Sequence, residues 1–439
     1  MNKKVALRYE DRYLMERRVA ITPTDVAKLI EKHGLEFYVE KSDKRVFKDD
    51  EYQKAGAKIV DDIKDIPVVF GVKEMPNELF QPNHTYIFFS HTIKGQPYNM
   101  PSLKKMVEKK INLIDYEKVR DEHGRRTIFF GRYAGLAGMI NSLWTLGQRL
   151  KARGIDTVFS HLKQSHLYHS LDEAKTDISA IGMDIVQNGL PKELTPVVIG
   201  ITGYGNVAGG AQEILSLLPV KEISPKALLE LDKINNLPNN VIYKVIFKEK
   251  HLAEPKEANK EFDLHEYYNH PERFVGVFEK YIDKLTLLVN AMYWDTRYPR
   301  LITNEYLKNN YTDKHKLIAI GDITCDPKGS IECTTDCTTI ENPVFVFDTK
   351  TGKKNNGFAG DGIALMGVDI LPSELPRESS EGFSYALFDF VNDIVTCDYS
   401  KPYPELKLPA PIKRGLILHN GEFTPEFKYM EDYIKNYEL

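Results

Sequence analysis

Polar residues that could move protons follow three successive apolar segments in the first third of the chain. The first segment, 67–74, ends in Lys73 and Glu74. The second, 86–91, ends in His91, with Lys94 just beyond it, and the third, 111–117, ends in Glu117. The carboxyl ends of the strands in an open α/β sheet border its ligand crevice, and histidine titrates near neutral pH. Each residue alone could equally be a solvated loop residue, but the three together favour a site.

A second group of residues is suited to binding a phosphate. Gly203, Gly205 and Gly209 follow an apolar, β-branched run at 197–201 and are spaced GxGxxxG, one residue longer than GxGxxG. In such a turn the first glycine permits the tight bend and the second lets the backbone approach a pyrophosphate. The N–H groups and the dipole of the following helix then favour the phosphates.

The surroundings of these glycines decide between a nucleotide site and an ordinary turn. The pattern predicts a strand at 197–201, a helix at 211–218 and a second strand at 220–223, which is the context that a dinucleotide fingerprint requires. A small residue at Gly209 or Gly210 would let the helix pack close to the strand. A structural turn remains the alternative, and a Walker A loop is excluded because no Gly-Lys-Ser/Thr ends the segment.

The rest of the chain predicts elements that would position these residues. Thr22 and Pro23 begin a helix that Gly34 ends, and strands alternate with helices, which indicates parallel sheets. The other expected elements are a long helix to about residue 153, strands at 286–294 and 317–323, the latter with Asp322 and Asp326 at its end, and a loop-rich stretch at 224–280.

Composition narrows the function classes. The chain has 439 residues, 28% of them charged, and a formal net charge of −4, so neither nucleic acid nor an anionic membrane surface is expected as a partner. We expect no signal peptide and no membrane span. Four cysteines are too few for a disulfide framework, which suggests a reducing, cytoplasmic location. Cys333 and Cys337, or His166 and His169, lack further ligands, and no metal site is expected.

Several motifs together resemble one enzyme family. The matching stretches are 16–23, 71–76, 89–94, 131–139, 203–213, 293–301, 321–330 with Glu332, 337–341 and 371–376. They are similar to the lysine-ketoglutarate reductase portion of the bifunctional lysine-degradation enzyme, which is a saccharopine dehydrogenase of the L-lysine-forming type. Fungal saccharopine dehydrogenase and alanine dehydrogenase are more distant relatives. The saccharopine-cleaving partner is not expected, since the sequence ends at Leu439.

The resemblance implies an α/β fold of two Rossmann-like domains with parallel sheets and an active cleft between them. A substrate and catalytic domain, residues 1–135 and 376–439, would be split by an inserted dinucleotide-binding domain, residues 136–375. The implied reaction is the NAD(P)-dependent condensation of L-lysine with 2-oxoglutarate to saccharopine, and its reverse. These small molecules would be the partners, and the chain could form a homo-oligomer.

The resemblance also implies roles for particular residues. Lys73 and His91 would carry the acid–base work. The dicarboxylate and amine site would comprise Arg18, Lys94, Glu117 and Arg126. The expected cofactor-binding residues are Gly203, Gly205, Asn206, Val207, Gly209, Glu222, Ser224, Asp322 and Asp326. The resemblance favours NADP over NAD, although Glu222 lies in the second predicted strand, where an acidic residue would favour NAD.

Two other functions fit the same sequence. An alanine-dehydrogenase-like or opine-type amino-acid dehydrogenase would share the fold and the Lys/His pair and would differ only in substrate. A non-catalytic nucleotide-binding sensor would keep the fingerprint, but the presence of Lys73 and His91 argues against it. Turnover of NAD(P)H with lysine and 2-oxoglutarate separates the three.

Overall fold

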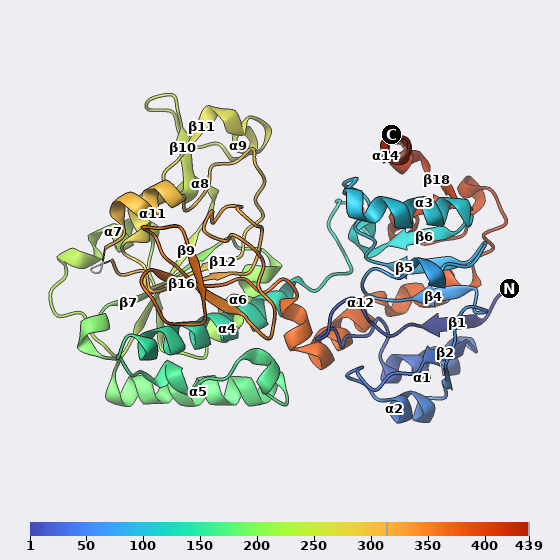
Figure 1. Cartoon of the computed structure of the whole chain (residues 1–439), viewed down its shortest axis with the longest axis horizontal. Coiled ribbons are helices and arrows are strands. Elements are labelled where there is room, and N and C mark those ends of the chain that lie inside the picture. The colour runs from blue at the N-terminus through green and yellow to red at the C-terminus, as the bar shows by residue number, and fades with distance from the viewer. Residues whose placement is uncertain (313–314, 438–439) are drawn as a thin grey trace. The chain divides into compact units, whose positions relative to one another are not determined.

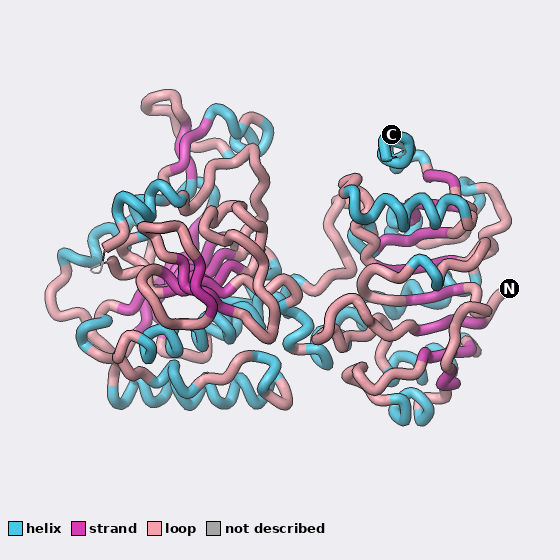
Figure 2. Tube along the Cα trace, viewed as in Figure 1, coloured by secondary structure: helices cyan, strands magenta, loops and turns pink. Residues whose placement is uncertain are grey.

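The computed structural model describes residues 1–312 and 315–437. The described part of the chain divides into two compact units: unit 1 is Met1–Phe130 with Pro376–Leu439, and unit 2 is Gly131–Leu375. Each is built around a mostly parallel sheet, magenta in Figure 2. The expected α/β class with two Rossmann-like parallel sheets is confirmed.

The sheet of unit 1 has the strand order β18-β17-β6-β5-β4-β1-β2-β3 (Figure 1). Its strands are β1 (Lys4–Leu7), β2 (Glu36–Glu40), β3 (Lys58–Val60), β4 (Val68–Phe70), β5 (Thr85–Phe88), β6 (Asn112–Asp115), β17 (Leu416–His419) and β18 (Glu422–Phe423). The pairs from β3 to β6 are parallel, whereas β17 joins β6 and β18 antiparallel. The last part of the chain therefore completes a sheet that the first part begins.

Helices cover both faces of this sheet. They are α1 (Pro23–His33), α2 (Asp49–Lys54), α3 (Met100–Glu108), α12 (Pro376–Thr396), α13 (Ala410–Gly415) and α14 (Glu431–Tyr437). Apolar side chains of α1 and α12 form one core with the sheet, and those of α3 form a second core with residues 417–430. Helix α1 has the predicted ends, because the Thr22 hydroxyl accepts from the Asp25 N–H and Gly34 closes the helix at φ +64°.

The sheet of unit 2 has the order β15-β14-β16-β13-β12-β7-β9-β8. Its strands are β7 (Val197–Thr202), β8 (Val220–Glu222), β9 (Ile242–Phe247), β12 (Leu287–Asn290), β13 (Ala319–Asp322), β14 (Val344–Phe347), β15 (Lys354–Asn356) and β16 (Ile363–Met366). From β8 to β16 the pairs are parallel, and β14 joins β16 and β15 antiparallel.

The helices of unit 2 lie on both faces of its sheet. They are α4 (Gly131–Ala152), α5 (Leu171–Asn188), α6 (Asn206–Leu215), α7 (Pro225–Glu230), α8 (Glu249–Leu252), α10 (Glu279–Ile282) and α11 (Asn304–Asn310). Helix α4 contacts both the sheet and α6 (Figure 1), whereas α7, α10 and α11 contribute to the core on the other face. A separate antiparallel pair, β10 (Ala253–Pro255) and β11 (Phe274–Gly276), carries α9 (Leu264–Asn269) between its strands.

Two sequence predictions in unit 2 were wrong. The helix predicted at 211–218 is α6, which begins five residues earlier at Asn206; within it, Gly210 packs closely against α4. The stretch 224–280 was expected to be loop-rich, yet it contains β9, a strand that lies between β7 and β8. Lys244 interrupts the apolar run of β9, but the remaining residues, Ile, Tyr, Val, Ile and Phe, are good strand formers.

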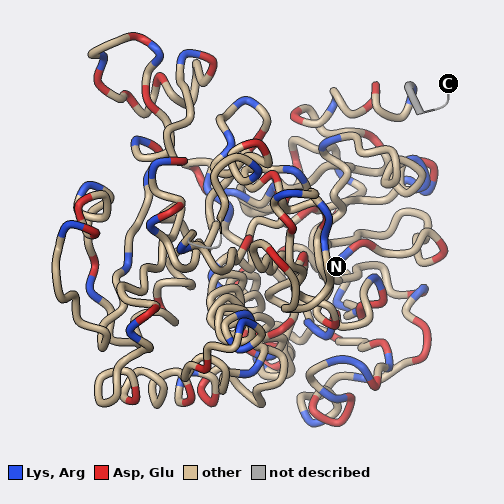
Figure 3. The backbone as a smooth tube through the Cα atoms, turned by 60° about the vertical axis from the view of Figure 1, so that its left-hand side comes forward, with Lys and Arg blue, Asp and Glu red and all other residues tan. Residues whose placement is uncertain are grey.

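Acidic and basic residues are interspersed along the backbone of both units (Figure 3). Among the described residues, no helix combines the length and the apolar character needed to cross a bilayer.

Candidate active site

The turn after β4 carries Lys73 and Glu74, and a buried carboxyl group holds its backbone. Oε1 of Glu10 accepts from the Val72 N–H at 2.7 Å, and Oε2 accepts from the Lys73 N–H at 2.8 Å. Burial raises the pKa of Glu10 to about 7, even though Arg8 and these two N–H groups favour the ionised form. Sequence reasoning missed Glu10, because nothing local marks a residue that binds the backbone of a turn 62 positions away.

We expect the stability cost of Glu10→Gln to depend on pH. A carboxyl whose pKa is raised in the folded protein stabilises it below the ordinary pKa of 4.5, and this contribution is lost as the pH rises through about 7. The substitution should therefore cost more unfolding free energy near pH 5 than near pH 8, by at most about 3 kcal/mol. Urea unfolding at both pH values measures this difference; an equal cost at both would contradict the assignment of the buried, protonated group.

His91 and Glu74 form a hydrogen-bonded pair at the ends of neighbouring strands. Nδ1 of His91 lies 2.6 Å from Oε1 of Glu74. Burial alone would raise the pKa of Glu74, but the hydrogen bond and charge of His91 outweigh it and hold that pKa below its usual value. An ionised carboxylate can only accept, so Nδ1 carries the proton and Nε2 is oriented to exchange one. The imidazole keeps 33% of its surface exposed.

The backbone around His91 is also held in place. His91 itself has a left-handed conformation, φ +51°, and its carbonyl accepts from the Asn99 amide at 2.9 Å. Just before it, Ser90 donates its N–H to the buried carboxylate of Asp115, which also accepts from the Glu117 N–H at 2.8 Å. Burial raises the pKa of Asp115. Asp115 therefore joins the loops that follow β5 and β6, a role that the sequence analysis did not assign.

Lys73 lies among acidic and aromatic groups. Its Nζ is 5.6 Å from the centre of the Tyr13 ring. Burial raises the pKa of Glu16, but Arg18 and then Lys73 outweigh it and lower that pKa overall. Lys73 also lowers the pKa of Glu74, although the effect of His91 on that carboxyl is larger.

The predicted substrate-binding residues occupy different surroundings. Arg18 is 3% exposed, makes a two-pronged contact with Glu16 and lies over the Phe130 ring at 4.1 Å. Glu117 and Arg126 form an ion pair in which Arg126 is largely exposed. Lys94 is exposed beyond β5. The structure thus brings Arg18 close to Glu16 and Lys73, and pairs Glu117 with Arg126.

In unit 2 the glycine-rich turn joins β7 to α6 as predicted. Gly203 has φ +89°, a conformation that favours glycine, and a Cβ there would lie 3.0 Å from the Ala291 carbonyl. A Cβ added at Gly205 or Gly209 would have no atom of the described residues within 4 Å. Packing among the described residues therefore does not require glycine at these two positions.

The close packing of α6 is not against the strand. A Cβ at Gly210 would overlap the Arg132 carbonyl of α4, and a Cβ at Gly135 of α4 would overlap the Val207 carbonyl of α6. The expectation that Gly209 or Gly210 allows helix–strand packing was therefore wrong. Gly210 serves helix–helix packing, and its partner is a glycine 75 positions earlier.

The N-terminus of α6 fits a pyrophosphate. Gly205 is its N-cap residue, and a glycine has no side chain that could cover the N–H groups of the first turn, to which Asn206 and Val207 belong. A cavity of about 180 Å³ adjoins Gly203 and Gly205, and its other lining residues are Tyr204, Glu249, Tyr267, Tyr268, Ala291, Met292, Tyr293 and Tyr298. Oε1 of Glu249 accepts from the Tyr268 hydroxyl at 2.6 Å and the Tyr204 hydroxyl at 3.3 Å.

The other expected cofactor residues lie at several places in the sheet. Glu222 ends β8, which is separated from β7 by β9, and it forms an ion pair with Lys244 at 2.7 Å. Ser224 caps α7 by accepting from the Ala227 N–H at 3.1 Å. The structure therefore gives Glu222 and Ser224 partners of their own on the far side of β9 from the fingerprint.

Asp322 belongs to a buried network at the carboxyl ends of neighbouring strands. The Thr202 hydroxyl of β7 donates to Asn290 of β12 at 2.7 Å, and the Asn290 amide donates to Asp322 of β13 at 2.9 Å. The Thr334 hydroxyl also donates to Asp322, at 2.6 Å. Burial raises the pKa of Asp322. Asp326 lies in the following loop, where its carbonyl accepts from the Gly329 N–H.

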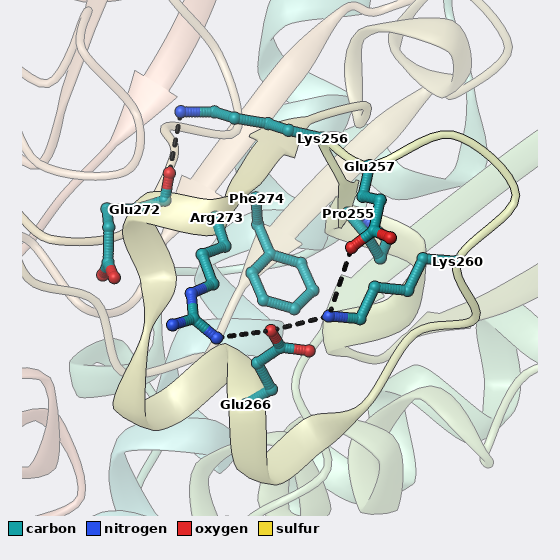
Figure 4. Close-up of a pocket in the computed structure, with 8 residues that line it drawn as sticks. All are labelled: Pro255, Lys256, Glu257, Lys260, Glu266, Glu272, Arg273 and Phe274. Atoms are coloured by element: carbon teal, nitrogen blue, oxygen red, sulfur yellow. Dashed lines mark hydrogen bonds and ion pairs between the residues drawn. The ribbon is translucent and has the colours of Figure 1, made fainter.

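A cavity of about 310 Å³ lies away from the fingerprint, on the segment that contains β10, α9 and β11 (Figure 4). Glu266 accepts there from both Lys260 and Arg273, at 2.8 and 3.0 Å. The ring of Phe274 forms its floor and packs on Tyr267. The charges balance each other, so this cluster stabilises the segment locally.

Comparison with known proteins relates this geometry to a family. Residues 6–137 match the family model for the alanine dehydrogenase/PNT N-terminal domain. Alpha-aminoadipic semialdehyde synthase of Arabidopsis thaliana is 37% identical over 430 residues, which are 94% of this chain and 40% of that protein. The NAD(+), L-lysine-forming saccharopine dehydrogenase of Yarrowia lipolytica is 27% identical over 395 residues, 88% of this chain and 90% of that protein. The chain is a homologue of the saccharopine dehydrogenases.

The likeness to solved structures concerns the fold. The solved structure of an L-alanine dehydrogenase matches this chain with a TM-score of 0.63 and 17% sequence identity. The match covers 98% of this chain and 99% of the L-alanine dehydrogenase. The homologue spans less than half the length of the alpha-aminoadipic semialdehyde synthases, 40% of the plant protein and 47% of the rat protein. The relationship expected from the sequence motifs is confirmed.

Proposed function

We propose that this saccharopine dehydrogenase homologue condenses L-lysine with 2-oxoglutarate and reduces the product to saccharopine, and catalyses the reverse reaction. The observation that carries the proposal is the Glu74–His91 hydrogen bond beside Lys73, in a chain whose relatives of similar length are named as L-lysine-forming saccharopine dehydrogenases. The domain roles follow: residues 1–135 and 376–439 bind substrate, and residues 136–375 bind the dinucleotide.

The residues present suit the proton transfers of this reaction. The ε-amine of lysine must lose a proton to attack the ketone, and the resulting hydroxyl must gain one to leave as water. Glu74 orients His91 so that Nε2 can move these protons, and such general acid–base catalysis contributes about 10²–10⁴-fold to a rate. Lys73 is the second acid–base group. Arg126, Arg18 and Lys94 are the cations for the carboxylates, for which arginine offers a two-pronged fork.

The fingerprint of unit 2 suits a nicotinamide dinucleotide, which supplies the hydride. Gly203 and Gly205 shape the turn, and the first N–H groups of α6 would hold the pyrophosphate. Asn206, Val207 and Gly209 belong to the same helix. The open space beside Gly205 and Gly209 supports this use more directly than the glycine spacing does.

A single assay separates the proposed function from its alternatives. NADPH or NADH oxidation is followed after mixing the protein with lysine and 2-oxoglutarate, and the product is identified by mass. Turnover to saccharopine supports the proposal. Turnover only with ammonium and another oxo acid would indicate an alanine-dehydrogenase-like activity instead. Cofactor binding without turnover of any substrate would indicate a non-catalytic nucleotide-binding sensor.

We propose NADP as the preferred cofactor, on the basis of the strand order. The strand beside β7 is β9, so the end of β9 is where a Rossmann fold recognises the adenosine ribose. There Lys248 is exposed, with its Nζ 5.3 Å from the centre of the Tyr204 ring in the fingerprint turn. Glu249 is already engaged by two tyrosine hydroxyls. A cation at this position suits a 2′-phosphate.

We expect Lys248→Gln to lower kcat/KM for NADPH by about 10–100-fold, the equivalent of one charge-assisted hydrogen bond, and to leave kcat/KM for NADH almost unchanged. Lys250→Gln, an exposed lysine two residues later, is the matched control and should change neither. Steady-state kinetics with both cofactors give the answer. Equal losses with NADPH and NADH would remove the 2′-phosphate from the explanation.

The compartment and the assembly of this chain stay predictions. The rat relative is named as mitochondrial, whereas the low cysteine content of this chain suggested the cytoplasm. Fractionation of its native cells and the mass of the protein in solution would decide these two points.

A further inference from the structure

Two cysteines in the loop after β13 lie in direct contact. Cys325 is buried, 6% exposed, and its thiol donates to the Gly367 carbonyl at 2.7 Å. Cys337 is exposed, and its Sγ lies 3.0 Å from the carbonyl oxygen of Cys325. The chain thus passes Cys325 just after the end of β13 and returns to the same place at Cys337.

The loop between the two cysteines is fixed to the sheet by its own side chains. Ser330 accepts from the Asn290 amide at 2.9 Å, and Thr334 donates to Asp322 at 2.6 Å. Ile331 pairs with Ile302 through a backbone bridge. These contacts hold Cys337 beside Cys325 in the folded protein, so the pairing does not depend on a chance encounter of two mobile segments.

We propose that Cys325 and Cys337 form a reversible disulfide that closes the loop 325–337 at the carboxyl end of β13. The proposal concerns a modification of the chain and does not depend on its enzymatic activity. Cys333 is fully buried and Cys397 belongs to unit 1. The contact between Cys337 and the carbonyl of Cys325 therefore makes these two cysteines the expected pair.

The exchange chemistry assigns different parts to the two thiols. The neighbouring thiol lowers the pKa of Cys337, and the Cys337 thiol together with burial raises the pKa of Cys325. The oxidant is a low-molecular-weight disulfide of the glutathione type. The Cys337 thiolate attacks it, forming a mixed disulfide and releasing one small thiol. Cys325 then attacks the Cys337 sulfur and releases the second. The protein dithiol is oxidised by two electrons, and its two protons end on the two released thiols.

Redox titration of the full-length protein tests the proposal. The protein is equilibrated in mixtures of oxidised and reduced glutathione, quenched with acid, and analysed by thiol counting under denaturing conditions and by peptide mass. Of the four cysteines, we expect two to become unreactive, a peptide pair linked through Cys325 and Cys337, and full recovery with dithiothreitol. Four reactive thiols throughout, or a link between any other pair, would overturn the proposal.

Three variants sharpen the test. Cys337→Ser changes an exposed side chain and should abolish the cross-link. Cys397→Ser, the matched control in unit 1, should leave it intact. Cys325→Ser keeps a hydroxyl that can donate to Gly367, and should stop the reaction at glutathione attached to Cys337. A stable glutathione adduct on Cys337 in the unchanged protein would show that the second exchange does not occur, and would also overturn the proposal.

Discussion

His91→Gln is expected to lower kcat by about 10²–10⁴-fold while cofactor affinity stays nearly unchanged. Glutamine preserves part of the hydrogen bonding to Glu74 but cannot transfer a proton, and general acid–base catalysis has roughly this magnitude. The substitution should also remove one limb of the pH–rate profile. Lys73→Met should have a similar effect and remove the other limb. Initial rates with saturating lysine and 2-oxoglutarate across the pH range measure both.

Two controls distinguish proton transfer from binding. His84→Gln changes a histidine that precedes β5 and whose Nδ1 contacts the Pro82 carbonyl; it should leave kcat alone. Lys94→Met removes an exposed cation beyond the same strand, and we expect it to raise KM rather than to lower kcat. If His91→Gln and Lys73→Met also raised only KM and left the pH profile unchanged, the two residues would be substrate ligands and not acid–base groups.

Gly205→Val should abolish dinucleotide binding and leave the fold intact. The backbone there has φ −81°, which valine can adopt, and the position of its Cβ is open. The branched side chain would occupy the space of the pyrophosphate. We expect affinity to fall at least about 100-fold, equivalent to about 3 kcal/mol, whereas valine at the N-cap should cost only about 1 kcal/mol of stability. Nicotinamide fluorescence titration and thermal unfolding measure the two effects.

Gly210→Val is the matched control for this prediction. Its side chain would meet the Arg132 carbonyl of α4, so the protein should lose stability rather than ligand contacts. A Gly205 variant that bound the cofactor with unchanged affinity would remove the fingerprint assignment. Equal destabilisation of both variants would show that Gly205 is structural after all.

The parts of the molecule that the sequence predicted well depend on neighbours in the chain. Thr22, Pro23 and Gly34 set the ends of α1 through contacts within the helix, and the turn at Gly203 requires a particular backbone angle. The strand-end positions of Lys73 and His91 followed from apolar runs, although each strand ends three residues before the side chain in question. Local patterns were sufficient in each case.

The parts that were missed depend on contacts between distant segments. Glu10 binds the backbone after β4, and Asp115 binds the segment before His91; a single sequence contains no sign of either pairing. The order of strands is a similar case. Glu222 was predicted to bind the cofactor on the assumption that β8, which follows β7 in the sequence, also lies next to β7 in the sheet. The strand next to β7 is instead β9.

The antiparallel pairing of β17 with β6 bears on how the protein is made. During synthesis the strands β1 to β6 emerge first, but the neighbour of β6 and the helix α12 that completes the core of unit 1 emerge only after all of unit 2. Domains tend to fold as units while the chain is synthesised, so unit 2 can finish folding on the ribosome before unit 1. Until then β6 presents an open edge, a surface prone to wrong pairing. A nascent chain stalled before residue 376 should therefore depend on chaperones for its first 130 residues, and not for the segment that follows.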